Sequence, residues 1–194
     1  MSGVVGVLAL QGAFDKHIEM LRAMGVDCQT VRFARELAGC DALIIPGGES
    51  TTMSLLMQKF ELYDELREFA ASKPVMGVCA GAILMADDVD DARVTPLKIM
   101  PMTAVRNSYG RQVSSFSAEL HLQCDADGPT YQAHFIRAPS IRPQSERIEV
   151  LAKYNEEPVM VRMGQHMALT FHPELTGDNH IHTCWLQGFH PIFK

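Results

Sequence analysis

Cys79 lies in a glycine-flanked segment whose residue types suit a nucleophile. Gly77 and Gly81 stand two residues before and two after it, and residues 74–85 pass from a short apolar run to a run of Ala, Ile, Leu and Met. This pattern predicts a strand that turns sharply into a helix, with Cys79 at the corner. Amides at the start of that helix would favour a thiolate and an adjacent oxyanion. The alternative is an ordinary buried cysteine.

A base for that cysteine is suggested by the segment Phe171-His172-Pro173-Glu174. Proline biases the residue before it toward extended geometry, and residues two apart on an extended segment point to the same side. Glu174 can therefore orient the His172 imidazole and stabilise its protonated form. We predict a triad in which Cys79 is the nucleophile, His172 the general base and acid, and Glu174 its orienter. A core histidine after a strand is the alternative, and the other seven histidines have no comparable neighbour.

A metal site is not expected. The cysteines, at positions 28, 40, 79, 124 and 184, are odd in number and lack C-x-x-C spacing, which argues against a disulfide framework or a zinc site and favours a reducing cytosol. His180 and His182 would diverge on a helix, because side chains at i and i+2 point apart. The acidic segment 87–91 lacks the glycine and distal glutamate of a calcium loop, so we expect a solvated loop.

A second candidate site is the segment 46–52, Pro-Gly-Gly-Glu-Ser-Thr-Thr, which follows a predicted strand. Ligands bind at the carboxyl ends of strands in open α/β sheets, and Gly47 and Gly48 let the backbone present amides there. Neither a Gly-Lys-Ser/Thr nor a Gly-x-Gly-x-x-Gly pattern follows the expected strands, so a phosphate-binding loop is not indicated. A simple turn in which Ser50 or Thr51 caps the next helix is the alternative.

The elements around these motifs predict a three-layer α/β/α fold with a central, mostly parallel sheet. Strands are expected at 4–10, 26–32 and 41–46, a connecting segment at 34–38, and helices over 14–24 and 53–72. Short β-like pieces predict an antiparallel extension, at 103–106, 112–116, 121–124, 132–136, 148–154, 158–163 and 167–171. A closing helix is expected over 179–189, with Asp178 as its N-cap.

Composition limits the classes of function. The chain has 194 residues, of which 47% are hydrophobic, which suits a single domain over 1–194 with a sizeable core. A net charge of -6 and scattered basic residues give no footprint for nucleic acid or an anionic membrane, so a small-molecule substrate is expected. The longest uncharged stretch, near 74–86, is shorter than the roughly 18 residues of a membrane span, and no basic leader precedes the first strand. A cytoplasmic location is therefore expected.

Taken together, the cysteine and histidine motifs make this chain resemble the class I, triad-type glutamine amidotransferases. Further motifs make it similar, more narrowly, to the family of glutaminase subunits of pyridoxal 5'-phosphate synthase: LALQGA at 8–13, PGGESTT at 46–52, RNSYGRQ at 106–112 and FIRAP at 135–139. The resemblance implies hydrolysis of L-glutamine to L-glutamate and ammonia through a thioester on Cys79. It further implies no cofactor, weak activity of the isolated subunit, and delivery of ammonia to a (β/α)8 synthase subunit.

The same resemblance assigns further residues. The glutamine site falls on Gly47, Gly48, Glu49, Arg106, Ile136 and Arg137, the oxyanion hole on the backbone N–H groups of Gly48 and Ala80, and part of the synthase interface on Gln11 and Gly12. Arginine offers a forked donor set for a carboxylate, and a glutamate can accept from an α-ammonium group. Two departures from the family are Val78, where threonine is usual, and the segment 95–102, which replaces a glycine- and leucine-rich lead-in.

Two other functions stay open. One is a non-catalytic assembly subunit that only binds the synthase, and the other is a different cysteine hydrolase on the same fold, acting on esters or aldehydes. An α/β-hydrolase is disfavoured because its acid precedes its histidine in sequence, whereas Glu174 follows His172. Ammonia release from glutamine in the presence of the synthase would separate these functions.

Overall fold

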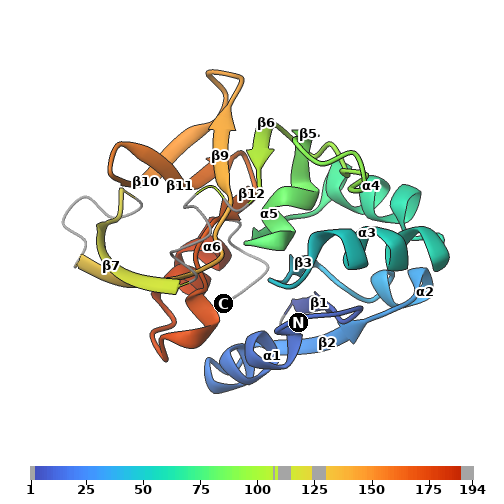
Figure 1. Ribbon diagram of the computed structural model, residues 1–194. Coiled ribbons are helices and arrows are strands. Elements are labelled where there is room, and N and C mark those ends of the chain that lie inside the picture. The colour runs from blue at the N-terminus through green and yellow to red at the C-terminus, as the bar shows by residue number, and fades with distance from the viewer. Residues whose placement is uncertain (1–2, 107, 109–114, 124–129, 189–194) are drawn as a thin grey trace.

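The structure, a computed structural model, describes residues 3–106, 108, 115–123 and 130–188. Seven strands form a central sheet in the order β10-β11-β12-β4-β3-β1-β2 (Figure 1). Their bounds are β1 Val4–Leu8, β2 Asp27–Val31, β3 Ala42–Ile45, β4 Val75–Val78, β10 Glu149–Tyr154, β11 Glu157–Met163 and β12 His166–Leu169. Strands β2, β1, β3, β4 and β12 are parallel, whereas β11 and β10 add antiparallel pairs at one edge. The mostly parallel sheet with an antiparallel extension is confirmed.

Helices cover both faces of this sheet. They are α1 Phe14–Ala23, α2 Ala34–Leu37, α3 Ser50–Lys59, α4 Tyr63–Ser72, α5 Ala80–Met85, the 3-10 helix η1 Pro173–Leu175, and α6 His180–Gln187. Strand β3 shows the two faces by alternation: Leu43 and Ile45 pack with α3 and α4, whereas Ala42 and Ile44 pack with α1 and α6. Successive side chains of a strand point to opposite faces, so a fully apolar strand needs cover on both sides. The α/β/α layering follows from this (Figure 1).

Two smaller sheets flank the central one. Strands β5 Ala86–Val89, β6 Met100–Val105 and β9 Ser140–Pro143 form a three-stranded sheet, and β7 Ser115–His121 pairs with β8 Thr130–Ile136 in a two-stranded one. These sheets position two segments of the site described below, because β6 is followed directly by Arg106 and β8 by Arg137. No helix among the described residues is long and apolar enough to span a membrane.

The single helix expected over 53–72 is wrong, because two helices occupy this region and the first begins at Ser50. Helix α3 ends in a Schellman motif, in which the N–H of Leu62 bonds the carbonyl of Met57 at 2.9 Å and that of Glu61 bonds Gln58 at 3.2 Å. Glu61 has the left-handed φ of 54° that glycine usually supplies at this position. Leu62 is then fully buried and turns the chain into α4.

Other boundaries also differ from expectation. Residues 34–38 contain the short helix α2, residues 87–89 of the expected acidic loop belong to β5, and β9 was not predicted. Of the expected strand 121–124, only His121 is in a strand, as the end of β7. The N-cap residue of α6 is Asn179, although Asp178 Oδ1 accepts the N–H of His180 at 2.8 Å. Positions 112–114, 124 and 189 lie outside the described residues.

Candidate active site

The backbone around Cys79 forms the sharp corner that the sequence predicts. Strand β4 ends at Val78, helix α5 begins at Ala80, and Cys79 between them has a φ of 51° and a ψ of -103°. A Cβ on Gly81 would lie 2.0 Å from the carbonyl oxygen of Ile45, and one on Gly77 would lie 2.7 Å from the backbone of Gly81. Both glycines are therefore required by the close approach of neighbouring backbone.

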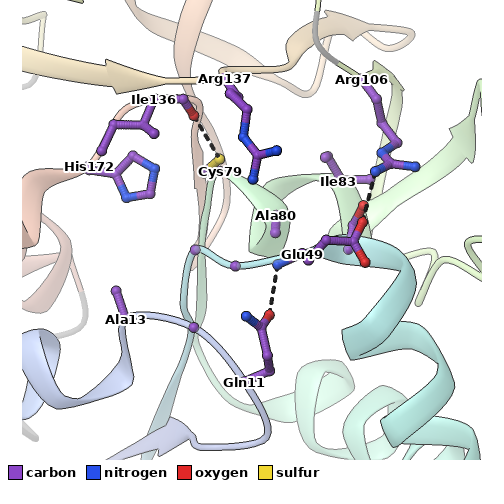
Figure 2. A pocket seen from close by; sticks show the side chains of 14 residues that line it. Gln11, Ala13, Glu49, Cys79, Ala80, Ile83, Arg106, Ile136, Arg137 and His172 are labelled. Carbon is purple, nitrogen blue, oxygen red and sulfur yellow. Dashed lines mark hydrogen bonds and ion pairs between the residues drawn. The ribbon is translucent and has the colours of Figure 1, made fainter. Parts of the chain in front are cut away.

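The predicted base lies at the end of the next strand of the sheet. Strand β12 pairs in parallel with β4, so the segments that follow the two strands leave the same edge of the sheet. Cys79 follows β4 and His172 follows β12. Both line one pocket, where Figure 2 shows the imidazole and the sulfur on the same wall. The topology thus brings together two residues that are far apart in sequence.

His172 is held by Glu174. The Nδ1 atom of His172 lies 2.7 Å from Oε1 of Glu174, and both side chains are buried. The carboxylate reaches the ring through the 3-10 turn η1, and not through the extended segment that we expected. Burial would lower the pKa of His172, but the thiol of Cys79 and the carboxylate of Glu174 raise it to about 10. Burial would raise the pKa of Glu174, but the hydrogen bond from His172 and nearby histidines hold it below its ordinary value.

The pocket has a volume of about 340 Å³. Apart from Glu174, which lies behind His172, every residue that the sequence assigned to the site lines it: Gln11, Gly12, Gly47, Gly48, Glu49, Cys79, Ala80, Arg106, Ile136, Arg137 and His172. Sequence reasoning missed Ala13 and Ile83, and it included Ser50 only as part of the candidate segment 46–52. Helical periodicity could have found Ile83, because it lies three residues after Ala80 on α5 and so on the same face.

The glycine segment at 47–48 is clamped between His172 and the loop after β1. A Cβ on Gly47 would lie 2.5 Å from Cε1 of His172, and one on Gly48 would lie 2.5 Å from Oε1 of Gln11. That Gln11 oxygen accepts the N–H of Glu49 at 2.7 Å. Gly12, with a φ of 97°, lies so close that its Cβ would be 1.9 Å from the carbonyl oxygen of Gly47. A movement of the loop at 11–12 would therefore be transmitted to the backbone beside the imidazole.

Glu49 is the N-cap of α3, so the alternative in which Ser50 or Thr51 caps this helix is wrong. Its carboxylate accepts the backbone N–H groups of Thr51 at 3.3 Å and Thr52 at 2.8 Å, and also the hydroxyl groups of both threonines. Burial would raise the pKa of Glu49, but these hydrogen bonds lower it to about 2. Glu49 is therefore a carboxylate at neutral pH, and it is partly exposed to the pocket.

Arg106 joins Glu49 to the acidic segment after β5. Its guanidinium group lies 2.8 Å from Oε1 of Glu49 and also forms an ion pair with Asp91. The sequence led us to expect Asp91 in a solvated loop. Asp91 is instead a second anchor for Arg106. A guanidinium group fixed by two carboxylates is pre-oriented to donate at one edge of the pocket. Figure 2 shows the ion pair between Arg106 and Glu49 on the side of the pocket opposite His172.

Arg137 supplies a second guanidinium group to the same pocket. It follows β8 with a left-handed φ of 42°, and Figure 2 shows its side chain directed into the pocket. None of the ion pairs found among the described residues involves Arg137. The neighbouring Ile136 carbonyl lies 3.9 Å from the sulfur of Cys79. No group of three or more potential metal ligands occurs in the described part of the chain.

A doubly wound sheet with a cysteine at a strand–helix corner, and a histidine–glutamate pair after the adjacent strand, has the architecture of a class I glutamine amidotransferase. The chain belongs to the SNO glutamine amidotransferase family, which matches residues 7–190. It is 47% identical to the pyridoxal 5'-phosphate synthase subunit PdxT of Methanoculleus marisnigri, over 95% of this chain and 96% of the relative. It is 43% identical to the protein of that name from Desulforudis audaxviator, over 94% and 96%. A solved glutamine amidotransferase structure superposes with a TM-score of 0.89 at 41% identity, covering 96% of this chain and 98% of that one.

Proposed function

We propose that this protein hydrolyses L-glutamine to L-glutamate and ammonia, acting as one domain over residues 1–194. The observation that carries the proposal is the convergence of Cys79 and the hydrogen-bonded pair of His172 and Glu174 on one pocket. The pocket also holds one carboxylate and two guanidinium groups, which suit the α-ammonium and the α-carboxylate of an amino acid. Membership of the SNO glutamine amidotransferase family supports the same substrate.

In the proposed reaction, His172 takes the proton of Cys79, and the thiolate sulfur attacks the side-chain amide carbon of glutamine. The resulting oxyanion accepts hydrogen bonds from the backbone N–H groups of Ala80 and Gly48. The protonated His172 then gives its proton to the leaving nitrogen, the carbon–nitrogen bond breaks, and ammonia departs from a thioester. Water, deprotonated by His172, attacks the thioester and releases glutamate and the Cys79 thiol. Glu174 holds the ring in one tautomer throughout.

The two ends of the substrate are distinguished by charge. Glu49 accepts from the α-ammonium group, because its low pKa keeps it ionised. Arg106 and Arg137 donate to the α-carboxylate, and Gly47 and Ile136 present backbone atoms to the chain of the substrate. This orientation places the side-chain amide beside Cys79, since the sulfur and the charged groups line the same pocket. Binding energy from the charged end would hold the amide in place for attack.

The partner is a pyridoxal 5'-phosphate synthase subunit of the (β/α)8 type, which receives the ammonia in the cytoplasm. The support is that the curated relatives are themselves named subunits of that synthase. Gln11 and Gly12 form part of the proposed interface. Because Gln11 bonds the N–H of Glu49 and Gly12 abuts Gly47, docking there can adjust the oxyanion-binding backbone. We therefore expect low activity in the isolated chain.

The test is glutamine hydrolysis with and without the synthase subunit of the same organism. Glutamate and ammonia should appear in equal amounts, faster in the complex than in the isolated chain, and the variant Cys79→Ala should release neither while keeping its circular dichroism spectrum. Undiminished ammonia release from Cys79→Ala would refute the assignment. Synthase binding without any glutamate production by the wild type would instead support the non-catalytic assembly subunit.

A further inference from the structure

Two histidines that the triad does not include lie behind Glu174. His17 comes from α1 and His182 from α6, and both side chains are fully buried. Nε2 of His17 is 3.6 Å from Oε2 of Glu174, and Nδ1 of His17 is 3.1 Å from Nε2 of His182. Glu174 thus has His172 on one carboxylate oxygen and His17 on the other. A continuous row of polar groups runs from the pocket into the core.

The free carboxylate oxygen needs this neighbour. Among the described residues, Oε2 of Glu174 and Nε2 of His17 have no hydrogen-bond partner at normal length, and both atoms are shielded from solvent. An ionised oxygen buried without a donor is costly, and Nε2 of His17 lies 3.6 Å from it. The separation of 3.6 Å exceeds a normal hydrogen bond by a few tenths of an ångström, so the two groups form a close ion-dipole contact in this structure.

The protons in this row can be assigned from chemistry. Burial lowers the pKa of His17 to about 4 and that of His182 to about 3, so both rings are neutral at pH 7 and carry one N–H each. A carboxylate only accepts, so His17 must present its Nε2–H to Glu174. Its Nδ1 is then an acceptor, and His182 must donate from Nε2. The opposite tautomer would place a nitrogen lone pair against the carboxylate oxygen.

We propose that His17, kept in its Nε2–H tautomer by His182, is a positioning residue that anchors the second oxygen of Glu174 and thereby fixes the His172 imidazole for proton transfer with Cys79. This inference rests on the proposed glutaminase function. A carboxylate held at one oxygen can rotate, whereas one held at both oxygens cannot. The His172 ring, which is hydrogen-bonded to this carboxylate, is then also restricted in its orientation. Helices α1 and α6, far apart in sequence, thereby both contribute to the catalytic geometry.

The first experiment measures kcat and KM for glutamine in the complex with the synthase. His17→Leu removes the N–H donor and has a side chain of similar volume. His17→Gln keeps an amide N–H that reaches the position of Nε2. His17→Asn also has an amide, but its shorter side chain leaves that amide short of Glu174. We expect kcat to fall about 10- to 100-fold in the Leu and Asn variants, with KM unchanged within about twofold, and to be largely kept in the Gln variant. The matched control is His166→Leu, which replaces a buried histidine outside this row.

A second readout does not depend on glutamine. Iodoacetamide alkylation of Cys79, followed by peptide mass spectrometry across pH, reports how readily its sulfur reacts. A loosely held carboxylate stabilises the His172 imidazolium less. The pH midpoint of the alkylation profile should therefore move upward by about half a pH unit in His17→Leu and His17→Asn, and should not move in His17→Gln. If Cys79 of the wild type is alkylated normally but the protein hydrolyses no glutamine, the proposed function is refuted. The alkylation profiles of the His17 variants then still decide the role of His17.

The positioning role is overturned by folded Leu and Asn variants with wild-type kcat and an unshifted alkylation profile. It is also overturned if His17→Gln is as impaired as His17→Asn, because the effect would then follow from loss of the ring and not of the donor. If His17→Leu does not fold, the comparison between the Gln and Asn variants decides, since both keep a polar side chain at residue 17.

Discussion

The imidazole of His172 lies directly against the backbone of Gly47, where a Cβ would be 2.5 Å from Cε1 of the ring. Glu174 holds the ring at Nδ1, so the ring cannot move away from Gly47 without straining that hydrogen bond. We expect Gly47→Ala to displace the base and lower kcat/KM about 100-fold, because sub-ångström misplacement is costly for proton transfer. Gly39→Ala is the control, since its nearest contact would be 3.6 Å away. Equal glutaminase rates in the two variants would contradict the contact.

The role of His172 as base can be separated from substrate binding. The variant His172→Asn keeps a polar side chain of smaller size but cannot accept the thiol proton. We expect glutamine binding, measured by calorimetry, to persist while thioester formation falls by about 10² to 10⁴. Acid quenching followed by mass spectrometry measures the thioester on Cys79. A normal amount of trapped thioester in this variant would rule out the role given to His172.

Arg106 should act on binding and not on the chemical step. It lies against Glu49, on the far side of the pocket from His172. Replacement by glutamine removes the positive charge, so we expect Arg106→Gln to raise KM for glutamine about 10- to 100-fold with little change in kcat. The control is Arg93→Gln, because Arg93 pairs with the same Asp91 but has a side chain that is 75% exposed. Steady-state kinetics in which kcat falls and KM is unchanged would overturn this assignment.

The corner that carries Cys79 depends on Gly81. A Cβ there would lie 2.0 Å from the carbonyl oxygen of Ile45, which is backbone in a central strand and cannot move freely. We expect Gly81→Ala to destabilise the protein by about 1–3 kcal/mol, as for other overpacked positions. Urea unfolding followed by circular dichroism measures this change, with Gly39→Ala again as the comparison. A midpoint equal to that of the wild type would show that the backbone tolerates a methyl group here.

Stability should fall in mild acid because of the two neutral buried histidines. The folded pKa is about 4 for His17 and about 3 for His182, against an ordinary value of 6.5. Between these values and pH 6.5 the unfolded chain binds protons that the folded chain does not, so stability is lost as pH falls through this window. Each group contributes at most about 1.4 kcal/mol per pH unit.

The variant His17→Gln removes one of these groups while keeping a donor for Glu174. The free energy of unfolding, measured in urea at pH 6.5 and at pH 4.5, should therefore fall less in this variant than in the wild type. Titrating groups that do not interact with residue 17 are the same in both proteins and cancel in the comparison, whereas Glu174 and His182 are coupled to His17. The expectation fails if both proteins lose the same free energy of unfolding over this interval.

The triad could be predicted from sequence because its signals are local. The small residues around Cys79 mark a corner, and Glu174 follows His172 by two positions, so neither feature requires knowledge of distant contacts. His17 has no such local signature, because its partners stand at positions 174 and 182. The same reason explains why strand β9 was missed: it is defined by antiparallel pairing with β6, across a long sequence separation.

The break between α3 and α4 was missed for a different physical reason. A left-handed residue at the end of a helix is usually glycine or asparagine, and here it is Glu61. Apolar periodicity continues through this position, so nothing in the residue types marked the end of the first helix. The ion pair between Arg106 and Asp91 was likewise hidden, because it depends on the pairing of β5 with β6.

Cys79 has a backbone conformation, with a φ of 51°, that is strained for any residue with a side chain. Glycine would adopt it without penalty, but glycine has no sulfur. Folding and chemistry therefore favour different amino acids at this one position. In a lineage that no longer needed the reaction, selection for folding would act against the cysteine, and drift to glycine there would mark a descendant that has lost its activity.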